Sequence, residues 1–127
     1  MDNKKVLIIE DDSFLSDMYK TKFSSDGFDV TMADDGETGI KLLKEGLRPA
    51  IILLDIVMPK LDGIETLTVI KKMDDVKNIP VIMLTNLGQK EEIDRAMALG
   101  AASYLIKANY TPSEVVKKVS DTLENKN

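Results

Sequence analysis

Acidic, hydroxyl and amino side chains follow four of the short apolar segments of this chain. In chain order these groups are the acidic run Glu10-Asp11-Asp12, then Asp55, Thr85 and Lys107. If the segments are strands of one parallel sheet, all of these groups lie at its carboxyl edge. The chain contains neither histidine nor cysteine. Any chemistry at this edge therefore uses carboxylates, hydroxyls and lysines.

Carboxylates that meet at one sheet edge predict a cation site. Two like charges about 4 Å apart repel by roughly 4 kcal/mol at an effective dielectric constant of about 20, so Asp11, Asp12 and Asp55 must take up a proton, accept a lysine or bind a cation. Oxygen ligands with room for water are typical of Mg²⁺. A carboxylate beside this metal can attack phosphorus and form an acyl phosphate. The alternative for Asp12 is the N-cap of the next helix.

Five segments of strand length alternate with five segments of helical periodicity. The strand segments are Val6–Ile9, Asp29–Met32, Ile51–Leu54, Val81–Leu84 and Tyr104–Ile106. Three of them carry no polar alternation, which is typical of parallel strands buried on both faces, and the more polar second segment is expected at a sheet edge. The helical segments place apolar stripes within residues 14–23, 40–47, 64–70, 93–97 and 115–123. The alternation predicts an α/β fold with a doubly wound, mostly parallel sheet.

Helix boundaries fall between these segments. Gly27, Gly46 and Gly100 each lie just past a helical stripe, where a left-handed residue closes a helix. The stretch Thr111-Pro112-Ser113-Glu114 places a threonine cap, a proline at the first helical position and a glutamate three residues after the cap. A helix is therefore expected to begin there.

Length and composition predict one globular domain. The 127 residues are 43% hydrophobic and 31% charged, with a net charge of −5. The only two arginines, Arg48 and Arg95, lie far apart in sequence, which argues against direct binding of nucleic acid. The apolar run Ala50–Leu54 is too short to span a membrane, and the N-terminus lacks the pattern of a signal peptide. A cytoplasmic protein is the default expectation.

Four stretches of the chain resemble the receiver domains of bacterial two-component response regulators. They are Val6–Asp12, Leu53–Pro59 with Asp62-Gly63, Pro80–Thr85 and Gly100–Lys107, in the order and at the spacing of the family. The resemblance, to a stand-alone receiver like the chemotaxis regulators, implies a flavodoxin-like sheet of strand order 2-1-3-4-5 flanked by five helices. It implies one receiver domain over residues 1–127, no output domain, and a signalling protein that promotes only its own phosphorylation and dephosphorylation.

The resemblance also implies a role for each group at the sheet edge. Asp55 would accept a phosphoryl group from a histidine kinase or a phosphotransfer protein. Asp11 and Asp12 would hold Mg²⁺, directly or through water, together with the Asp55 carboxylate and the main-chain carbonyl of Val57. Lys107 would pair with the phosphoryl oxygens.

Thr85 and Tyr104 are the switch residues that the resemblance implies. The Thr85 hydroxyl would move toward the phosphoryl group, and Tyr104 would move inward into the space it leaves. A downstream protein would then bind the surface of the fourth helix, fifth strand and fifth helix. The alternative for Tyr104 is a core residue with its hydroxyl at the rim. The resemblance is compatible with a monomer or a weak, phosphorylation-dependent dimer.

The chain departs from the family pattern after Lys107. The family usually has proline there, often after a cis peptide bond, whereas this chain has Ala108. A cis bond costs about 2.5–4 kcal/mol before a residue other than proline, which favours a trans bond. Val57 and Leu87, two residues past Asp55 and Thr85, are both apolar. Neither can orient an attacking water, so slow loss of the phosphoryl group is expected.

Two other functions compete with the phosphoacceptor prediction. A degenerate receiver would act as a docking module without phosphorylation, but this chain keeps Asp55, Thr85 and Lys107 together with the acids after the first strand. A magnesium-dependent phosphohydrolase with an aspartyl nucleophile commonly carries a second acid two residues after the first. Val57 occupies that position here, which disfavours the enzyme.

Overall fold

The computed structural model describes residues 4–86 and 88–124, which form a five-stranded parallel sheet covered by helices. The strands are β1 (Lys5–Ile9), β2 (Asp29–Ala33), β3 (Ile51–Asp55), β4 (Val81–Thr85) and β5 (Ser103–Ile106). Their order across the sheet is β2-β1-β3-β4-β5, and every neighbouring pair is parallel. The predicted doubly wound fold is confirmed. The polar second strand lies at an edge, as its composition predicts.

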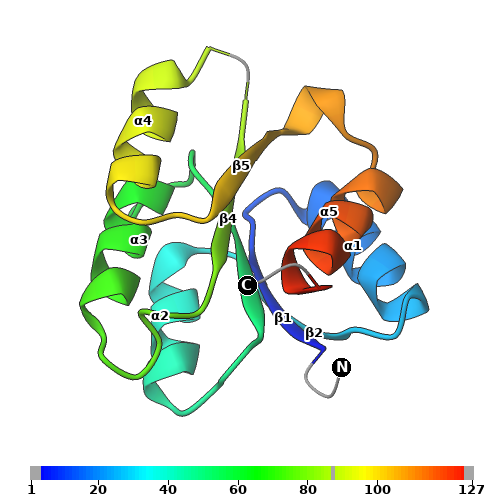
Figure 1. Ribbon diagram of the computed structural model, residues 1–127, viewed down its shortest axis with the longest axis horizontal. Helices are drawn as coiled ribbons and strands as arrows, with labels where there is room; N and C mark the ends of the chain where they lie inside the picture. Colours follow the sequence, from blue (N-terminus) through cyan, green and yellow to red (C-terminus); the bar gives the residue numbers. More distant parts are fainter. Residues whose placement is uncertain (1–3, 87, 125–127) are drawn as a thin grey trace.

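Helices cover both faces of the sheet (Figure 1). They are α1 (Ser13–Ser25), α2 (Gly36–Lys44), α3 (Gly63–Lys72), α4 (Lys90–Ala98) and α5 (Pro112–Glu124). The helices α1 and α5 lie side by side on one face, while α2, α3 and α4 lie on the other. No helix in the described part of the chain is long and apolar enough to cross a membrane.

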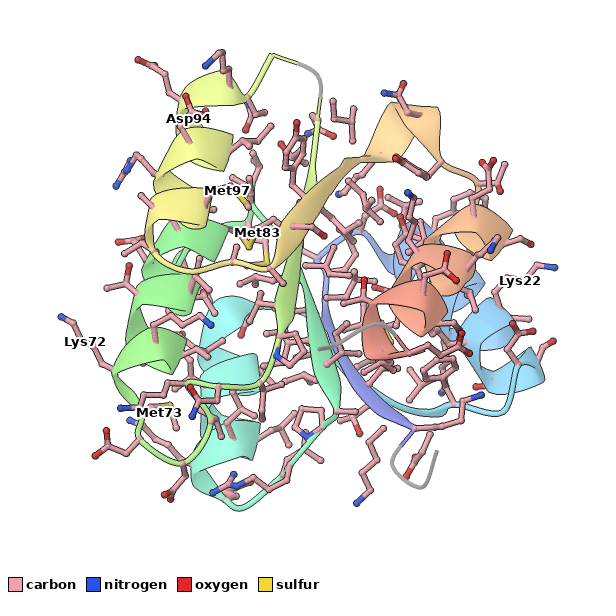
Figure 2. The ribbon with its side chains drawn as sticks, viewed as in Figure 1. Lys22, Lys72, Met73, Met83, Asp94 and Met97 are labelled. Carbon is pink, nitrogen blue, oxygen red and sulfur yellow. The ribbon has the colours of Figure 1, made fainter. Side chains whose placement is uncertain are left out.

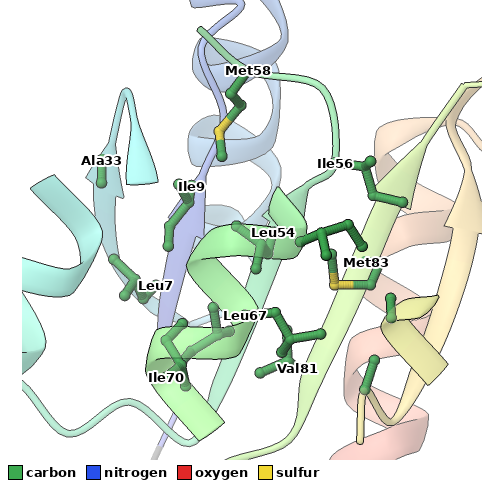
Figure 3. Close-up of a cluster of buried hydrophobic side chains, with 14 of the residues drawn as sticks. Leu7, Ile9, Ala33, Leu54, Ile56, Met58, Leu67, Ile70, Val81 and Met83 are labelled. Carbon is green, nitrogen blue, oxygen red and sulfur yellow. The ribbon is translucent and has the colours of Figure 1, made fainter. Parts of the chain in front are cut away.

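Successive residues of the central strands enter two separate cores. In β1, Leu7 and Ile9 pack toward α2, α3 and α4, whereas Val6 and Ile8 pack toward α1 and α5. Figure 3 shows the first of these clusters, in which α3 lies against the strands. Because both faces are covered, the central strands carry apolar side chains on both sides, which explains the unbroken apolar runs that precede Asp55 and Thr85.

Charged helix residues lie on the outside of these layers. Figure 2 shows Lys22, Lys72 and Asp94 pointing away from their helices, while Met83 of β4 lies between the sheet and the helices. Met83 is fully buried and the three charged residues are exposed. Burial of one large apolar side chain contributes about 1.5–3 kcal/mol. The strands that carry the polar groups are therefore held in place by the apolar layers on both faces of the sheet.

The predicted helix boundaries are present. Gly27, Gly46 and Gly100 have φ angles of 87°, 110° and 105°, in the left-handed region that glycine adopts readily. At the start of α5, the Glu114 N–H donates to Thr111 Oγ1 at 3.2 Å, and the Thr111 N–H donates to Glu114 Oε1 at 2.8 Å. These two bonds form the capping box that the sequence predicts.

A close approach at Gly63 holds α3 against the end of β3. The Gly63 N–H donates to the Ile56 carbonyl at 2.7 Å, and Asp62 caps the helix by accepting from the Glu65 N–H at 2.8 Å. A Cβ atom at position 63 would overlap the carbonyl oxygen of Asp55. Glycine at this position therefore lets the helix begin directly beside Asp55.

Candidate functional site

Four polar residues from different strand ends meet at the carboxyl edge of the sheet. Asp55 is the last residue of β3 and Thr85 the last of β4, while Glu10 follows β1 and Lys107 follows β5. Because β3 lies between β1 and β4, Asp55 is at the centre of this group. Asp55 is only 2% exposed to solvent. The sequence prediction that Asp55, Thr85 and Lys107 share one edge is confirmed by the strand order.

Lys107 bridges two carboxylates. Its Nζ atom lies 2.9 Å from Glu10 Oε1 and 3.1 Å from Asp55 Oδ2. The lysine side chain is 15% exposed, and both carboxylates are buried. Buried charges of this kind persist because each one has an opposite partner; removing one partner leaves an uncompensated charge.

Glu10 belongs to the acidic cluster and was not among the predicted metal ligands. One carboxylate oxygen from each of Glu10, Asp11 and Asp55 lies within 4.8 Å of the other two. The second oxygen of Glu10 accepts from the Asp12 N–H at 3.0 Å, which fixes the orientation of the carboxylate. The signal for Glu10 was present in the sequence: it is the first residue after the apolar run of β1, as Lys107 is after β5.

Asp12, a predicted metal ligand, caps helix α1 in this structure. Its Oδ1 atom accepts from the N–H groups of Phe14 at 2.9 Å and Leu15 at 3.1 Å, so Asp12 is the N-cap of α1. This is the alternative that its place before a helical segment allowed. Among the described residues, the cluster that could hold a cation consists of Glu10, Asp11 and Asp55. The placement of Asp12 in that cluster is therefore corrected.

Burial and a neighbouring charge oppose ionisation of Asp55. Loss of solvent, followed by the negative charge of Glu10, raises the pKa of Asp55 to about 7, although Lys107 acts in the opposite direction. Burial by itself lowers the pKa of Lys107, but its hydrogen bond to Glu10 and the charges of Asp55 and Glu10 outweigh burial and raise the pKa. The ammonium group is thus held in its charged form beside the two carboxylates.

One oxygen of Asp55 is open to a ligand. Oδ1 is buried and has no hydrogen-bond partner within residues 4–86 and 88–124. A buried carboxylate oxygen without a donor is rare in folded proteins. The open oxygen and the all-oxygen donor set of Glu10, Asp11 and Asp55 fit a hard divalent cation such as Mg²⁺.

Thr85 and Tyr104 differ in exposure. Thr85 is fully buried, and its hydroxyl donates to the Asn86 carbonyl at 3.2 Å. Tyr104 is 43% exposed on β5 and faces Met83 of β4 in the strand register. The alternative in which Tyr104 is a core residue is not what the structure shows.

The segments after β3 and β5 complete the rim of the site. The Val57 side chain is exposed, whereas Leu87 lies outside the described residues. The Lys107–Ala108 bond is trans, as favoured for a residue other than proline. The chain then makes one 3₁₀ turn, η1 (Lys107–Asn109), which leads toward α5.

Known proteins resemble this chain in sequence and in fold. The sequence model of the response regulator receiver domain matches residues 6–120. The probable transcriptional regulator ycf27 of Guillardia theta is 36% identical over 98% of this chain but 47% of its own length. The chain thus spans about half the length of the curated relatives it matches.

Solved structures agree with this match. The receiver domain of Francisella response regulator 1452 is 32% identical, covers 98% of this chain and 100% of its own, and superposes with a TM-score of 0.85. The Mn²⁺-bound form of response regulator Rcp1 is 28% identical, covers 96% of this chain and 93% of its own, and has a TM-score of 0.79. The chain belongs to the family of response regulator receiver domains.

Proposed function

We propose that Asp55 accepts a phosphoryl group in a reaction that depends on Mg²⁺. The observation that carries this proposal is the environment of Asp55: a buried carboxylate with one open oxygen, beside a cluster of acids and one bound ammonium. One oxygen of the Asp55 carboxylate attacks phosphorus, the bond between phosphorus and the donor breaks, and its electron pair leaves with the donor. An acyl phosphate on Asp55 results.

Glu10, Asp11 and Asp55 would hold the cation, with the main-chain carbonyl of Val57 as a further oxygen ligand. Bound Mg²⁺ supplies charge neutralisation for the phosphoryl oxygens. The fit of the donor set supports this assignment, and the similar response regulator Rcp1 has been solved in an Mn²⁺-bound form. Asp12 keeps its role as the cap of α1.

Lys107 now forms an ion pair with Asp55, and after phosphorylation its ammonium would pair with the phosphoryl group. Its ammonium already lies 3.1 Å from Asp55 Oδ2, so it is close to any group attached to this carboxylate. Pairing with a phosphoryl oxygen would keep the buried ammonium neutralised while the carboxylate charge is consumed in the new bond. An ionised carboxylate has no proton to lose when it attacks phosphorus, so the attack itself needs no general base, which agrees with the absence of histidine.

Thr85 and Tyr104 would carry the change to the surface. The Thr85 hydroxyl now donates to the Asn86 carbonyl, and rotation toward the phosphoryl group would exchange this bond for a charge-assisted one. Tyr104, now partly exposed, would move inward. The surface of α4, β5 and α5 would change shape, and a downstream protein would bind there.

A histidine kinase or phosphotransfer protein is the proposed phosphodonor. Phe14, at the start of α1, is 72% exposed. It lines a hollow of about 590 Å³ with Met18 and Pro112, close to the capped start of α1 that follows the acidic cluster. An apolar hollow beside the phosphoacceptor edge supports docking of a protein donor there. The stand-alone organisation that the sequence predicts stays a prediction, because the curated relatives are about twice as long.

Intact-protein mass spectrometry after incubation with acetyl phosphate tests this proposal. The wild-type protein should gain one phosphoryl group in Mg²⁺, and none in the presence of a chelator. An Asp55→Asn variant should gain none under either condition. Absence of the adduct from folded wild-type protein with several donors would overturn the proposal and favour a docking module that works without phosphorylation.

A further inference from the structure

Gly36, the first residue of α2, lies in a close approach between two helices. The residue is buried, and α2 lies beside α3 (Figure 1). A Cβ atom at position 36 would overlap Thr66 Oγ1 of α3, and it would lie 3.2 Å from both the Leu61 carbonyl oxygen and Thr66 Cβ. Protein interiors are close-packed, so a side chain here would push α2 away from α3 and from the loop before it.

The backbone at Gly36 does not itself require glycine. Gly36 is helical and is not among the glycines with a positive φ angle. Within a helix, alanine is favoured over glycine by about 1 kcal/mol. The space available at this position, rather than conformational freedom, therefore accounts for the glycine.

Thr66, which faces Gly36, is tied to the start of α3. It is fully buried. Its hydroxyl donates to the Asp62 carbonyl at 2.8 Å, and its N–H donates to the same carbonyl at 2.9 Å. Asp62 is the N-cap of α3. Because Thr66 is held in this way, a methyl group at position 36 would disturb the first turn of α3 rather than a freely moving side chain.

The loop between β3 and α3 is held at both ends. At one end the Ile56 carbonyl accepts from the Gly63 N–H at 2.7 Å. At the other end the Leu61 carbonyl lies against Gly36. Val57, whose main-chain carbonyl is a proposed cation ligand, lies between these two contacts. A displacement of α2 or of the first turn of α3 would therefore be transmitted to this carbonyl.

Helix α2 also contacts the strand that precedes the acidic cluster. A Cβ atom at Gly39 of α2 would lie 2.5 Å from Ile9 Cδ1. Ile9 is the last residue of β1, and Glu10 follows it directly. The two glycines of α2 thus bring one helix against both parts of the proposed cation site: the strand that leads to the acids and the loop that carries Val57.

We propose that Gly36 is a positioning residue: because it has no side chain, α2 can support the loop between β3 and α3 and so keep the Val57 carbonyl beside the acids that would bind the cation. The inference rests on the cation site proposed above. Gly36 touches neither the cation nor the phosphoryl group in this role. Its effect reaches them only through Leu61 and the first turn of α3.

Titration calorimetry of Mg²⁺ binding tests this role. Gly36→Ala should weaken Mg²⁺ binding about tenfold, a usual loss when a residue behind a metal ligand is changed. Gly46→Ala is the matched control: position 46 has a φ angle of 110°, which strains any other residue, and a Cβ atom there would meet no described residue beyond its chain neighbours within 4 Å. Both variants should lose stability in urea, but Gly46→Ala should bind Mg²⁺ like wild type. Unchanged affinity in Gly36→Ala, or an equal loss in Gly46→Ala, would overturn the proposal.

Removal of the Thr66 hydroxyl should restore part of the affinity. Thr66→Ala takes away the atom that a methyl group at position 36 would overlap, so the double variant should bind Mg²⁺ more tightly than Gly36→Ala alone. It should still bind more weakly than Thr66→Ala, because the Leu61 carbonyl remains close to the new methyl group. This second comparison applies if Gly36→Ala alone does not fold. Equal affinities in the double variant and Thr66→Ala, with no loss in Gly36→Ala, would contradict the assigned role.

Amide hydrogen exchange in the presence of a chelator separates this inference from the proposed function. The Gly63 N–H bonds to the Ile56 carbonyl. Relative to the amides of the central strands, it should exchange faster in Gly36→Ala than in Gly46→Ala. This readout requires neither cation nor phosphodonor, so it still tests the positioning if the wild-type protein binds no Mg²⁺. Equal relative exchange at Gly63 in the two variants would show that Gly36 does not hold the loop.

Discussion

The ionisation of Asp55 depends on the charges around it. Burial and Glu10 hold the pKa of Asp55 at about 7, so near neutral pH the carboxylate is ionised only in part. A nucleophile must be ionised to attack phosphorus. A divalent cation between Glu10, Asp11 and Asp55 would favour the ionised form by lowering this pKa, which gives Mg²⁺ two roles: neutralising the phosphoryl group and keeping its acceptor ready.

The raised pKa of Asp55 predicts a pH-dependent stability. Because its folded-state pKa of about 7 lies above its ordinary value of 3.8, the folded protein keeps a proton that the unfolded chain releases. The unfolding free energy therefore falls as pH rises from about 4 to about 7. Between pH 5 and pH 8, wild type should lose about 2 kcal/mol more than Asp55→Asn. Urea unfolding in chelator measures this difference, and parallel pH curves for the two proteins would contradict it.

The reassignment of Asp12 predicts which acids bind the metal. Glu10→Gln and Asp11→Asn should each weaken Mg²⁺ binding about tenfold or more, because each removes a charge from the cluster. Asp12→Asn keeps a capping side chain and should leave the affinity within about twofold. Titration calorimetry measures all three, since the chain has no tryptophan to report binding. A loss in Asp12→Asn equal to that in Glu10→Gln would restore Asp12 as a ligand.

Sequence reasoning at the residue scale worked for groups that follow a clearly bounded strand. Asp55 and Thr85 end their strands and Lys107 follows β5, so parallel pairing brings them to one edge. It failed for the run of three acids. Which of them points to the sheet edge depends on where β1 ends and α1 begins, and the type of residue is compatible with either role.

At the scale of elements, the periodicity of the sequence was sufficient because each strand is buried on both faces. Every predicted strand is present, with its bounds extended by at most one residue at either end. The turns were harder to predict from the sequence. Lys60, in the loop between β3 and α3, has a φ angle of 66°, a left-handed conformation that a lysine does not predict. This loop passes directly beside Asp55 and is shaped by packing rather than by local preference.

Gly63 is the element-scale feature that most directly positions the site. Gly63→Ala places a methyl group against the Asp55 carbonyl, so it should lower the unfolding free energy by about 1–3 kcal/mol and slow phosphorylation. Lys72→Ala, an exposed position on the same helix, should change stability by less than about 0.5 kcal/mol. Urea unfolding and the mass assay measure both effects. Equal unfolding free energies for the two variants would show that α3 can move away from β3 without loss of stability.

At the scale of the whole molecule, two cores on opposite faces of the sheet connect the site to distant surfaces. The α2–α4 core and the α1–α5 core share the strands that carry Asp55 and Thr85. A charge change at the sheet edge can therefore bias the packing on either side, if the structure has two alternative arrangements. Thr85 and Tyr104, on neighbouring strands, are the residues where such a change would reach the surface.

Inward movement of Tyr104 predicts a change in tyrosine fluorescence. Beryllium fluoride, a tetrahedral mimic of a bound phosphoryl group, should reduce iodide quenching of tyrosine emission in Mg²⁺, because Tyr104 leaves the solvent. The emission is readable because tryptophan is absent. Tyr104→Phe should show no such reduction, which makes it the matched control. Quenching that stays constant in wild type would place the switch elsewhere.

Chemical mapping of the acyl phosphate tests the central claim most directly. After phosphorylation by acetyl phosphate in Mg²⁺, borohydride reduces an aspartyl phosphate to homoserine, and peptide mass spectrometry then locates the changed residue. Homoserine should appear at position 55, and only when both the phosphodonor and Mg²⁺ are present. Homoserine at another aspartate, or at position 55 without Mg²⁺, would contradict the account.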